Sequence, residues 1–383
     1  MNLCFITTFP PTQCGIATYS NYLIKSLINL NPNIKIFVIC ESNIDQSLIE
    51  NYLNVKVFPC FNRESDYYEQ ILDLLKDLDL DIVHIQHEYG IFGKDFRFLK
   101  LLKGIKDLGL KLIVTLHTLH TKDCFSSTDW ESYEKEISTF CDFLVVHLEF
   151  CMGKVMERIG VDPKKIVVIP HGTYEVSKID KLLARKKLGL PEKGKILLSF
   201  GFVRKLKDEL TVIDSLYLIK KEVPDVYLFI AGNPQPNREE DLEYLNLCKQ
   251  RVKELNLEKE VIFSDRFIRD KDLPYVFSAS DVCIFAYRDE VRSASGSFHL
   301  AVGAGKPVIL SRIPKFEEEG ILNISDEIMA IPQTPESFAK IAIRFFTDKP
   351  FYEYVKSKIK EFGLKTSWEN IAQKHLDLYK VFF

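Results

Sequence analysis

The chain lacks several features that would place it in a specialised class of protein. No uninterrupted apolar run reaches the roughly 18 residues that a membrane-spanning helix needs, and the N-terminus shows no basic segment followed by a long apolar stretch and a small-residue cleavage site. Neither sign of charge dominates, since 54 acidic and 51 basic residues leave a net charge of -3. This balance argues against a nucleic-acid binder with a broad basic surface. We therefore expect a cytoplasmic protein, associated at most peripherally with the inner face of a membrane.

The nine cysteines follow no metal-binding or disulfide pattern. They are scattered, with no C-x-x-C pair and mostly apolar neighbours, so we expect reduced, buried thiols. The sequence also lacks a G-x-G-x-x-G motif and a P-loop, which are the fingerprints of dinucleotide and triphosphate sites. Cys14 has no visible activating partner, and this favours a packing role over a catalytic thiol.

Short apolar runs alternate with longer amphipathic stretches in the first half of the chain. The runs expected to form strands are Leu3–Ile6, Ile34–Cys40, Ile82–Ile85, Leu112–Leu116, Phe143–Val146 and Ile166–Ile169. The helical patterns between them are Thr18–Leu30, Tyr67–Leu75, Phe96–Ile105 and Phe150–Ile159. Strands that are apolar throughout and separated by helices are typical of a parallel sheet covered on both faces. We predict a doubly wound α/β domain.

The same rhythm restarts after the Pro-His-Gly of residues 170–172. The runs expected to form strands in this half are Ile196–Phe200, Val226–Ala231, Val261–Ser264, Val282–Phe285 and Pro307–Leu310, with helices from Pro335 onward. A chain of 383 residues exceeds what one hydrophobic core usually serves, so we predict two Rossmann-like domains, residues 1–172 and 173–365. Ligands bind outside the carboxyl ends of such strands, and we expect the site in a cleft between the two domains.

The first apolar run ends in the segment TFPPTQCGIATY, residues 8–19. A strand, a tight turn, a glycine and then a helix direct unpaired backbone N–H groups and the positive end of the helix dipole at an anion or a polar ligand. Gly15 would let a ligand approach the backbone closely, or would let φ be positive. We expect this turn to line the site.

A second glycine turn lies in LLSFGFVRKLKDELTVIDSL. Gly201 ends the predicted strand, and Arg204, Lys205 and Lys207 precede a predicted helix. Cations beside a helix N-terminus bind a diphosphate well, because its oxygens gain charge-assisted hydrogen bonds. Lysines are common on any surface, so the spacing alone leaves a solvated loop as the alternative.

A third turn, SASGS, strengthens the prediction of an anion site. Ser295, Gly296 and Ser297 would supply N–H and hydroxyl donors at the start of a helix of small residues. Serine caps on ordinary helices are very common. Two such turns in one domain make a phosphate site the better interpretation.

Histidines provide a further signal in the first half. Five of the eight lie in or just after predicted strands: His84, His87, His117, His147 and His171. We predict that His87, Glu88 and His117 contact a polar substrate, and that His84, inside its strand, is a core residue. No two of the five have the i, i+4 spacing of a helical metal site, so metal binding is the weaker alternative.

Taken in order, these segments resemble the retaining glycosyltransferases of family 4, which have the GT-B fold. The resemblance spans nearly the whole chain and rests on FPPTQCGIATY, DIVHIQHEYGIFG, VTLHT, VIPHG, FGFVRKLKDELTVIDSL, VIFSDRFI, LPYVFSASDVCIFAY, SASGSFHLAVGAGKPVI and the SWENIA that opens the last helix. Each segment alone is weakly specific, but their order and spacing together are specific. The resemblance implies two Rossmann-like domains and a C-terminal helix, residues 366–383, that crosses back to the N-terminal domain.

The family moves a sugar from a nucleotide diphosphate sugar, bound mainly by the C-terminal domain, to an acceptor bound mainly by the N-terminal domain. By resemblance, Arg204 and Lys207 hold the donor diphosphate and His117 lies near the transferred sugar, and we assign catalysis to these three residues. The resemblance assigns donor binding to Gly15, Phe202, Gly232, Phe267, Ile268, Ser295, Gly296 and Ser297. Contacts with the acceptor or the sugar are assigned to Gln13, His87 and Glu88. It implies no cofactor and no metal.

The chain departs from the family at one motif. Where the family commonly carries a pair of glutamates, this sequence has Arg292 and Leu300, and Asp289 or Glu290 is the candidate replacement carboxylate. The resemblance favours a mannosyltransferase that uses GDP-mannose, with a glycan, a lipid-linked or a small-molecule acceptor. The alternatives are a UDP-glucose-dependent transferase, a nucleotide-sugar-binding protein without turnover, and a metal hydrolase built on the histidines.

Overall fold

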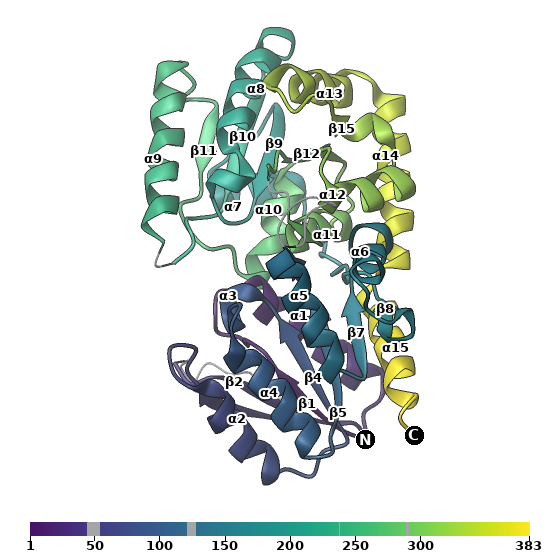
Figure 1. Cartoon of the computed structure of the whole chain (residues 1–383). Helices are drawn as coiled ribbons and strands as arrows, with labels where there is room; N and C mark the ends of the chain where they lie inside the picture. Colours follow the sequence, from purple (N-terminus) through teal and green to yellow (C-terminus); the bar gives the residue numbers. More distant parts are fainter. Residues whose placement is uncertain (44–53, 121–127, 237, 289–290) are drawn as a thin grey trace. The chain divides into compact units, whose positions relative to one another are not determined.

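The computed structural model describes residues 1–43, 54–120, 128–236, 238–288 and 291–383 (Figure 1). These residues form two compact units, each with its own parallel sheet. The first unit comprises Met1–Gly172, Val291–Gly296 and Trp368–Phe383, and the second comprises Thr173–Glu290 and Ser297–Ser367. The chain thus leaves the first unit after Gly172 and returns to it twice.

The first unit is built on a seven-stranded parallel sheet with the order β3-β2-β1-β4-β5-β7-β8. The strands are β1 (Asn2–Ile6), β2 (Lys35–Glu41), β3 (Val55–Phe61), β4 (Ile82–His87), β5 (Lys111–Leu116), β7 (Phe143–Val146) and β8 (Ile166–Val168). Six of them match the predicted runs. The strand order reverses between β1 and β4, which is where doubly wound sheets bind ligands.

The sequence prediction missed β3, an edge strand. It contains Lys56 and Pro59, and only Phe61 in it is fully buried. An edge strand pairs on one side only, so it tolerates proline and needs no continuous apolar run. β3 therefore has no continuous apolar run, which is the pattern that predicted the other strands.

Helices cover both faces of this first sheet. They are α1 (Gly15–Leu30), α2 (Tyr67–Lys76), α3 (Tyr89–Phe92), α4 (Phe96–Asp107), α5 (Thr128–Phe140), α6 (Lys154–Arg158) and α15 (Trp368–Lys380). Cys4 and Ile6 of β1 join the core beneath α2 and α4, while Leu3 and Phe5 join the core shared with α1 and α15. The alternation of side chains along one strand thus supplies two separate apolar layers.

The C-terminal helix α15 packs within the first unit, as predicted. Its apolar stripe includes Trp368, Ile371 and Tyr379, all buried beside α1. The hydroxyl of Tyr379 lies 2.7 Å from Nδ1 of His84, whose Nε2 lies 2.8 Å from the hydroxyl of Thr115. His84 is therefore a fully bonded core residue, which confirms the prediction for it.

The second unit has a six-stranded parallel sheet with the order β11-β10-β9-β12-β14-β15. The strands are β9 (Lys195–Phe200), β10 (Val226–Ala231), β11 (Val261–Phe263), β12 (Val282–Phe285), β14 (Val308–Ser311) and β15 (Met329–Ala330). The helices are α7 (Lys181–Leu188), α8 (Glu209–Glu222), α9 (Glu239–Glu254), α10 (Leu273–Ala279), α11 (Gly296–Gly303), α12 (Pro314–Phe316), α13 (Pro335–Thr347) and α14 (Lys349–Lys365). Here the strand order reverses between β9 and β12.

One predicted helix has a different geometry. The segment expected to be helical over Phe150–Ile159 begins as a π-helical turn, Glu149–Gly153, and continues as α6. The N–H groups of Met152 and Gly153 both bond the carbonyl of Leu148, and this widens the turn. None of the helices in the described ranges combines the length and the apolar character that crossing a bilayer requires.

Candidate active site

The first candidate segment follows β1 at the carboxyl edge of the first sheet. Cys14 is the extended residue that precedes α1, and its Sγ accepts a hydrogen bond from the hydroxyl of Thr8 at 3.6 Å. Gly15 is the first residue of α1 and its φ is not positive, so of the two roles considered for this glycine only close approach of a ligand to the backbone remains. A Cβ at Gly15 would meet open space. The turn therefore leaves the N-terminus of a 16-residue helix accessible, with Gln13 exposed beside it.

A row of histidines crosses the carboxyl edge of the first sheet. His117 follows β5, His147 follows β7 and His171 follows β8. His117 Nδ1 lies 3.1 Å from His147 Nε2, and His117 Nε2 lies 2.9 Å from Oε1 of Gln86 in β4. The Tyr19 ring of α1 contacts all three imidazoles, with ring centroids 4.6 to 5.4 Å apart. His117 is only 6% exposed, and its contact with the sugar stays a prediction.

His87, the last residue of β4, belongs to the core. Its ring packs against Tyr89, Phe92 and Phe98, with centroids 4.8, 6.0 and 4.5 Å away. Neither ring nitrogen has a hydrogen-bond partner among the residues that the structure describes, and burial lowers the pKa of His87 to about 3. The predicted substrate contact of His87 is not supported, because β4 is buried on both faces up to its final residue.

Glu88 lies next to His87 and remains half exposed. Its carboxylate caps the short helix α3 by accepting a hydrogen bond from the N–H of Tyr89, and it accepts another from the hydroxyl of Thr118 at 2.7 Å. Thr118 belongs to the two-residue strand β6 (Thr118–Leu119), which pairs with β13 (Arg292–Ser293). Glu88 is thus fixed at the sheet edge, and its contact with an acceptor stays a prediction.

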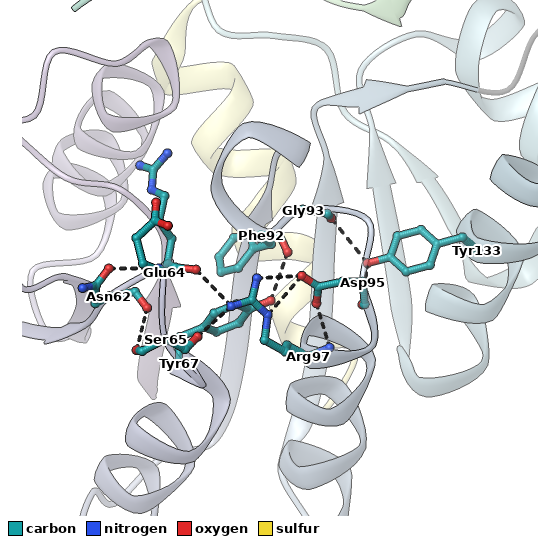
Figure 2. Close-up of polar contacts among 10 residues, drawn as sticks. Asn62, Glu64, Ser65, Tyr67, Phe92, Gly93, Asp95, Arg97 and Tyr133 are labelled. Atoms are coloured by element: carbon teal, nitrogen blue, oxygen red, sulfur yellow. Dashed lines mark hydrogen bonds and ion pairs between the residues drawn. The ribbon is translucent and has the colours of Figure 1, made fainter. Parts of the chain in front are cut away.

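A polar network stiffens the loops at this edge (Figure 2). Asp95 caps α4 and binds the guanidinium of Arg97 at 2.8 Å. Nη1 of Arg97 donates to the carbonyls of Arg63 and Ser65, which lie in the loop after β3. The hydroxyl of Tyr133 donates to the carbonyls of Gly93 and Asp95. The loops that follow β3 and α3 are therefore tied to α4 and α5.

The second unit brings a cation, a hydroxyl and a glycine together after β9. Gly201 has φ 115°, a left-handed conformation that glycine adopts readily. A Cβ at this position would lie 2.5 Å from Nζ of Lys207 and 2.8 Å from Oγ of Ser297. The Lys207 ammonium also lies 5.0 Å from the centroid of the Tyr287 ring. Two hydrogen-bond donors thus converge above bare backbone, at the carboxyl end of the central strand.

Arg204 has a different environment from Lys207. Its Nε lies 3.6 Å from Oδ2 of the buried Asp241, in α9. Both side chains line a pocket of about 680 Å³ together with Arg238, Tyr244 and others. The structure therefore pairs Arg204 with an acidic residue that sequence reasoning did not single out.

The other predicted donor residues of the second unit lie near Gly201. A Cβ at Gly232 would clash with the carbonyl of Gly201, so the loops after β9 and β10 touch backbone to backbone. The hydroxyl of Ser264 accepts the Gly232 N–H at 2.8 Å and joins the loop after β11 to them. The Phe202 and Phe267 rings pack with centroids 5.8 Å apart, and Ile268 is buried. The sequence did not single out Ser264, although Ser264 directly follows β11 just as Gly201 follows β9 and Gly232 follows β10.

Comparisons with known proteins cover both units. Residues 14–174 match the family model described as Glycosyltransferase Family 4, and residues 180–362 match the one described as Glycosyl transferases group 1. The chain belongs to family 4, group 1 of the glycosyltransferases. This confirms the family that its motifs suggested.

Two relatives of the chain are distant in sequence. Mannosylfructose-phosphate synthase of Agrobacterium fabrum is 25% identical over 59% of this chain, and the match spans about half (53%) of that enzyme. Alpha-monoglucosyldiacylglycerol synthase of Streptococcus pneumoniae is 25% identical over 80% of this chain and 69% of its own length.

Solved structures show the fold. Anabaena HepE, in complex with UDP-glucose, superposes with a TM-score of 0.78 at 16% identity over the whole of both chains. Sucrose-phosphate synthase from Thermosynechococcus elongatus gives a TM-score of 0.76 at 18% identity, covering 100% of this chain and 98% of its own. The predicted GT-B fold is confirmed.

Arg292 and Leu300 occupy the two positions at which the family commonly carries a pair of glutamates. Arg292 is buried in β13, and its Nη1 donates to the carbonyl of Cys151 at 3.3 Å. Leu300 packs against the core of the second unit. The candidate carboxylates Asp289 and Glu290 lie outside the described residues.

The third predicted phosphate turn, residues 295–297, lies at the start of α11. Ser295 is buried, while Gly296 opens α11 with its backbone exposed. A Cβ at Gly296 would lie 3.5 Å from Nε2 of His171. Ser297 is the residue whose hydroxyl lies above Gly201, so of this turn it is Ser297 that the structure brings to Lys207.

The sequence did not single out Glu209, a buried titratable residue of the second unit. Glu209, the first residue of α8, is 2% exposed, and its Oε2 has no hydrogen-bond partner in the described part of the chain. Burial raises the pKa of Glu209 to about 8, although the charge of the neighbouring Lys207 lowers it in part. Acidic residues in the first turn of a helix are normally exposed partners of the helix dipole, so sequence gave no signal here.

Proposed function

We propose that this protein is a retaining hexosyltransferase that takes its sugar from a nucleotide diphosphate donor without a divalent metal. The convergence of Lys207 Nζ and Ser297 Oγ above Gly201 carries the proposal. A diphosphate placed there gains one charge-assisted and one neutral hydrogen bond, and the backbone of Gly201 leaves room for its oxygens. The second unit then binds the donor and the first unit binds the acceptor.

The reaction we propose is a front-face displacement. The bond between the anomeric carbon and the diphosphate oxygen breaks, the acceptor oxygen bonds to that carbon on the same face, and the acceptor's proton passes to the departing diphosphate. No side chain has to serve as general base in this scheme. Lys207 and the N-terminus of α11 stabilise the charge that develops on the leaving group, and fixed donors of this kind contribute about 3 kcal/mol each.

Arg204 is the second cation we assign to the leaving diphosphate. Its present partner, Asp241, lies 3.6 Å away and is also 4.0 Å from Nε of Arg238. Asp241 therefore has a second cation beside it when Arg204 turns to a ligand. His117 is assigned a contact with the transferred sugar.

The donor we favour from the sequence is GDP-mannose. UDP-glucose is the second candidate, because the superposable HepE structure holds UDP-glucose. Thermal-shift measurements with GDP, UDP, GDP-mannose and UDP-glucose should show a raised melting temperature either with the two guanine nucleotides or with the two uracil nucleotides. The reason is that a ligand that binds only the folded state raises the melting temperature according to its affinity.

Turnover then separates an enzyme from a binding protein. Release of the nucleoside diphosphate, with or without an added acceptor, should follow binding of the matching nucleotide sugar. The anomeric configuration of the product, read by NMR, tests retention. Binding of a nucleotide sugar with no release of diphosphate under any acceptor would support the non-catalytic alternative instead.

The acceptor class we propose is a glycan, a lipid-linked sugar or a small molecule. Three basic side chains of α4 do not favour binding to a lipid surface, because each of them has an acidic partner nearby. Lys103 bonds Asp107 at 2.6 Å, Lys106 bonds Asp142 at 2.7 Å, and Arg97 bonds Asp95. Flotation with liposomes that contain anionic lipid should leave the protein unbound, whereas co-flotation would assign it to the membrane surface.

A further inference from the structure

Four polar groups at the carboxyl edge of the first sheet form one continuous hydrogen-bonded chain. The carbonyl of Ile169 lies 3.0 Å from Nδ1 of His147. Nε2 of His147 lies 3.1 Å from Nδ1 of His117, and Nε2 of His117 lies 2.9 Å from the side-chain amide of Gln86. All three side chains are buried, with 2%, 6% and 0% exposure for His147, His117 and Gln86. Each link therefore has to match a donor with an acceptor.

The backbone end of the chain fixes its direction. A carbonyl only accepts, so Nδ1 of His147 carries a proton toward Ile169. A neutral His147 then has a bare Nε2, which accepts the proton on Nδ1 of His117. A neutral His117 in turn has a bare Nε2, and its partner has to be the N–H of the Gln86 amide. The amide nitrogen of Gln86 makes no hydrogen bond as placed, so turning the amide breaks none.

The opposite direction requires a buried charge. If Oε1 of Gln86 stays as placed, Nε2 of His117 has to donate, and Nδ1 of His117 has to accept from His147. His147 would then carry protons on both nitrogens, because Ile169 still demands one. A doubly protonated His147 would be a charge at 2% exposure, in contact with His117, whose own pKa is lowered well below its ordinary value by burial and by the neighbouring imidazoles. Tyr19, packed on these rings from α1, is itself held neutral by burial, which raises its pKa.

We propose that His147 is a positioning residue that holds His117 as its Nδ1–H tautomer, so that Nε2 of His117 is a hydrogen-bond acceptor. Nε2 of His117 accepts the N–H of the Gln86 amide, so the ring assigned to the transferred sugar is held at both nitrogens and gives no N–H to a phosphate oxygen. The part that concerns the sugar rests on the proposed glycosyltransferase function. The tautomer itself does not, and it can be measured in the protein alone.

The direct test is a long-range ¹H–¹⁵N correlation spectrum of the full-length protein labelled in histidine. His117 should show a protonated Nδ1 and a bare Nε2 at neutral pH, and His147 should show the same pattern. A His117 spectrum with the proton on Nε2, or a doubly protonated His147 at neutral pH, would overturn the proposal. Activity plays no part in this readout, so its failure is distinct from failure of the proposed function.

Substitution of His147 tests the positioning role. His147→Phe keeps a ring but removes both nitrogens, and it should let His117 move its proton to Nε2 and should lower kcat/KM for the sugar donor about tenfold, the loss expected for one hydrogen bond. His147→Gln places an amide oxygen near the position of Nε2, so it should restore the Nδ1–H tautomer of His117 and most of the activity. A His117 tautomer that is unchanged in His147→Phe would refute the role.

His375→Phe is the matched control. His375 is buried in the same unit and bonds a backbone carbonyl, that of Ile371, at 2.9 Å, but it has no hydrogen bond to His117. It should leave the His117 spectrum unchanged. Where His147→Phe does not fold, the wild-type spectrum and His147→Gln still decide the proposal.

Discussion

The ammonium group of Lys207 lies beside the backbone of Gly201, 2.5 Å from the position that the Cβ of any other residue would occupy. Ser297 reaches the same place from the start of α11, with its Oγ 2.8 Å from that position. The loop after β9 thus combines a left-handed glycine with two donors that a side chain would displace. Substitutions of Gly201 and Lys207 therefore test the proposed donor site most directly.

Gly201→Ala should impair both stability and activity. The methyl group would force Lys207 and Ser297 apart, and φ 115° is unfavourable for alanine, so we expect a loss of about 1–3 kcal/mol in the free energy of unfolding. The KM for the nucleotide sugar should also rise. Gly189→Ala is the control, because Gly189 has φ 66° with nothing within 4 Å. It should lose stability only, with kcat/KM unchanged.

Lys207→Ala should lower kcat by about a hundredfold, since it removes a cation that stabilises the leaving diphosphate. The double variant Arg204→Ala, Lys207→Ala should be slower still. Lys205→Ala, an exposed neighbour in the same loop, should retain normal turnover. Steady-state kinetics with saturating donor provides the measurement, and wild-type turnover in the double variant would remove both residues from the site.

Glu209→Gln should change how stability depends on pH. The pKa of Glu209 is about 8 in the folded protein against 4.5 ordinarily, so the folded state holds its proton more tightly. This contribution is fully present below pH 4.5 and is lost as the pH rises from 4.5 to 8, by about 5 kcal/mol. Denaturant unfolding should show the wild type losing stability over this range relative to the variant.

Glu336→Gln serves as the comparison for Glu209, because Glu336 also lies in the first turn of a helix but is exposed. Its stability should follow the wild-type pH profile. Parallel curves for the wild type and Glu209→Gln would mean that Glu209 is ionised in the folded protein at neutral pH.

Tyr379→Phe should weaken the docking of α15 in the first unit. The variant loses the 2.7 Å bond to His84 and leaves a buried imidazole nitrogen without a partner, which costs about 1–3 kcal/mol. Thermal and urea unfolding of the variant would measure this loss. Tyr354→Phe, on the exposed face of α14, should unfold like the wild type.

Removal of divalent metals should leave turnover unchanged if Lys207 neutralises the leaving group. We expect equal rates with EDTA and with added Mg²⁺ or Mn²⁺ after dialysis against chelator. In the described part of the chain, no group of three His, Cys, Asp or Glu side chains is placed to hold a metal ion. A rate that requires added metal would contradict the proposed mechanism.

Local sequence predicted the elements that are buried on both faces, because their apolar runs are continuous. It located eleven of the strands and the stripe of α15, and its ordered motifs identified the glycosyltransferase family. It did not find β3, whose edge position removes the need for such a run. It also placed His87 at the substrate, since a strand end looks the same in sequence whether its last side chain is exposed or packed on three aromatic rings.

The sequence by itself thus determined the periodicity, the glycine turns and the family. Only the tertiary structure decided which polar side chains meet: Lys207 with Ser297, Arg204 with Asp241, and His117 with His147. It also decided that Glu209 is buried and that Arg292, buried in β13, donates to the carbonyl of Cys151. The physical reason is that apolar patterning is a property of neighbouring residues in the chain, whereas hydrogen bonding, burial and proton affinity depend on groups that folding brings together from distant strands and helices.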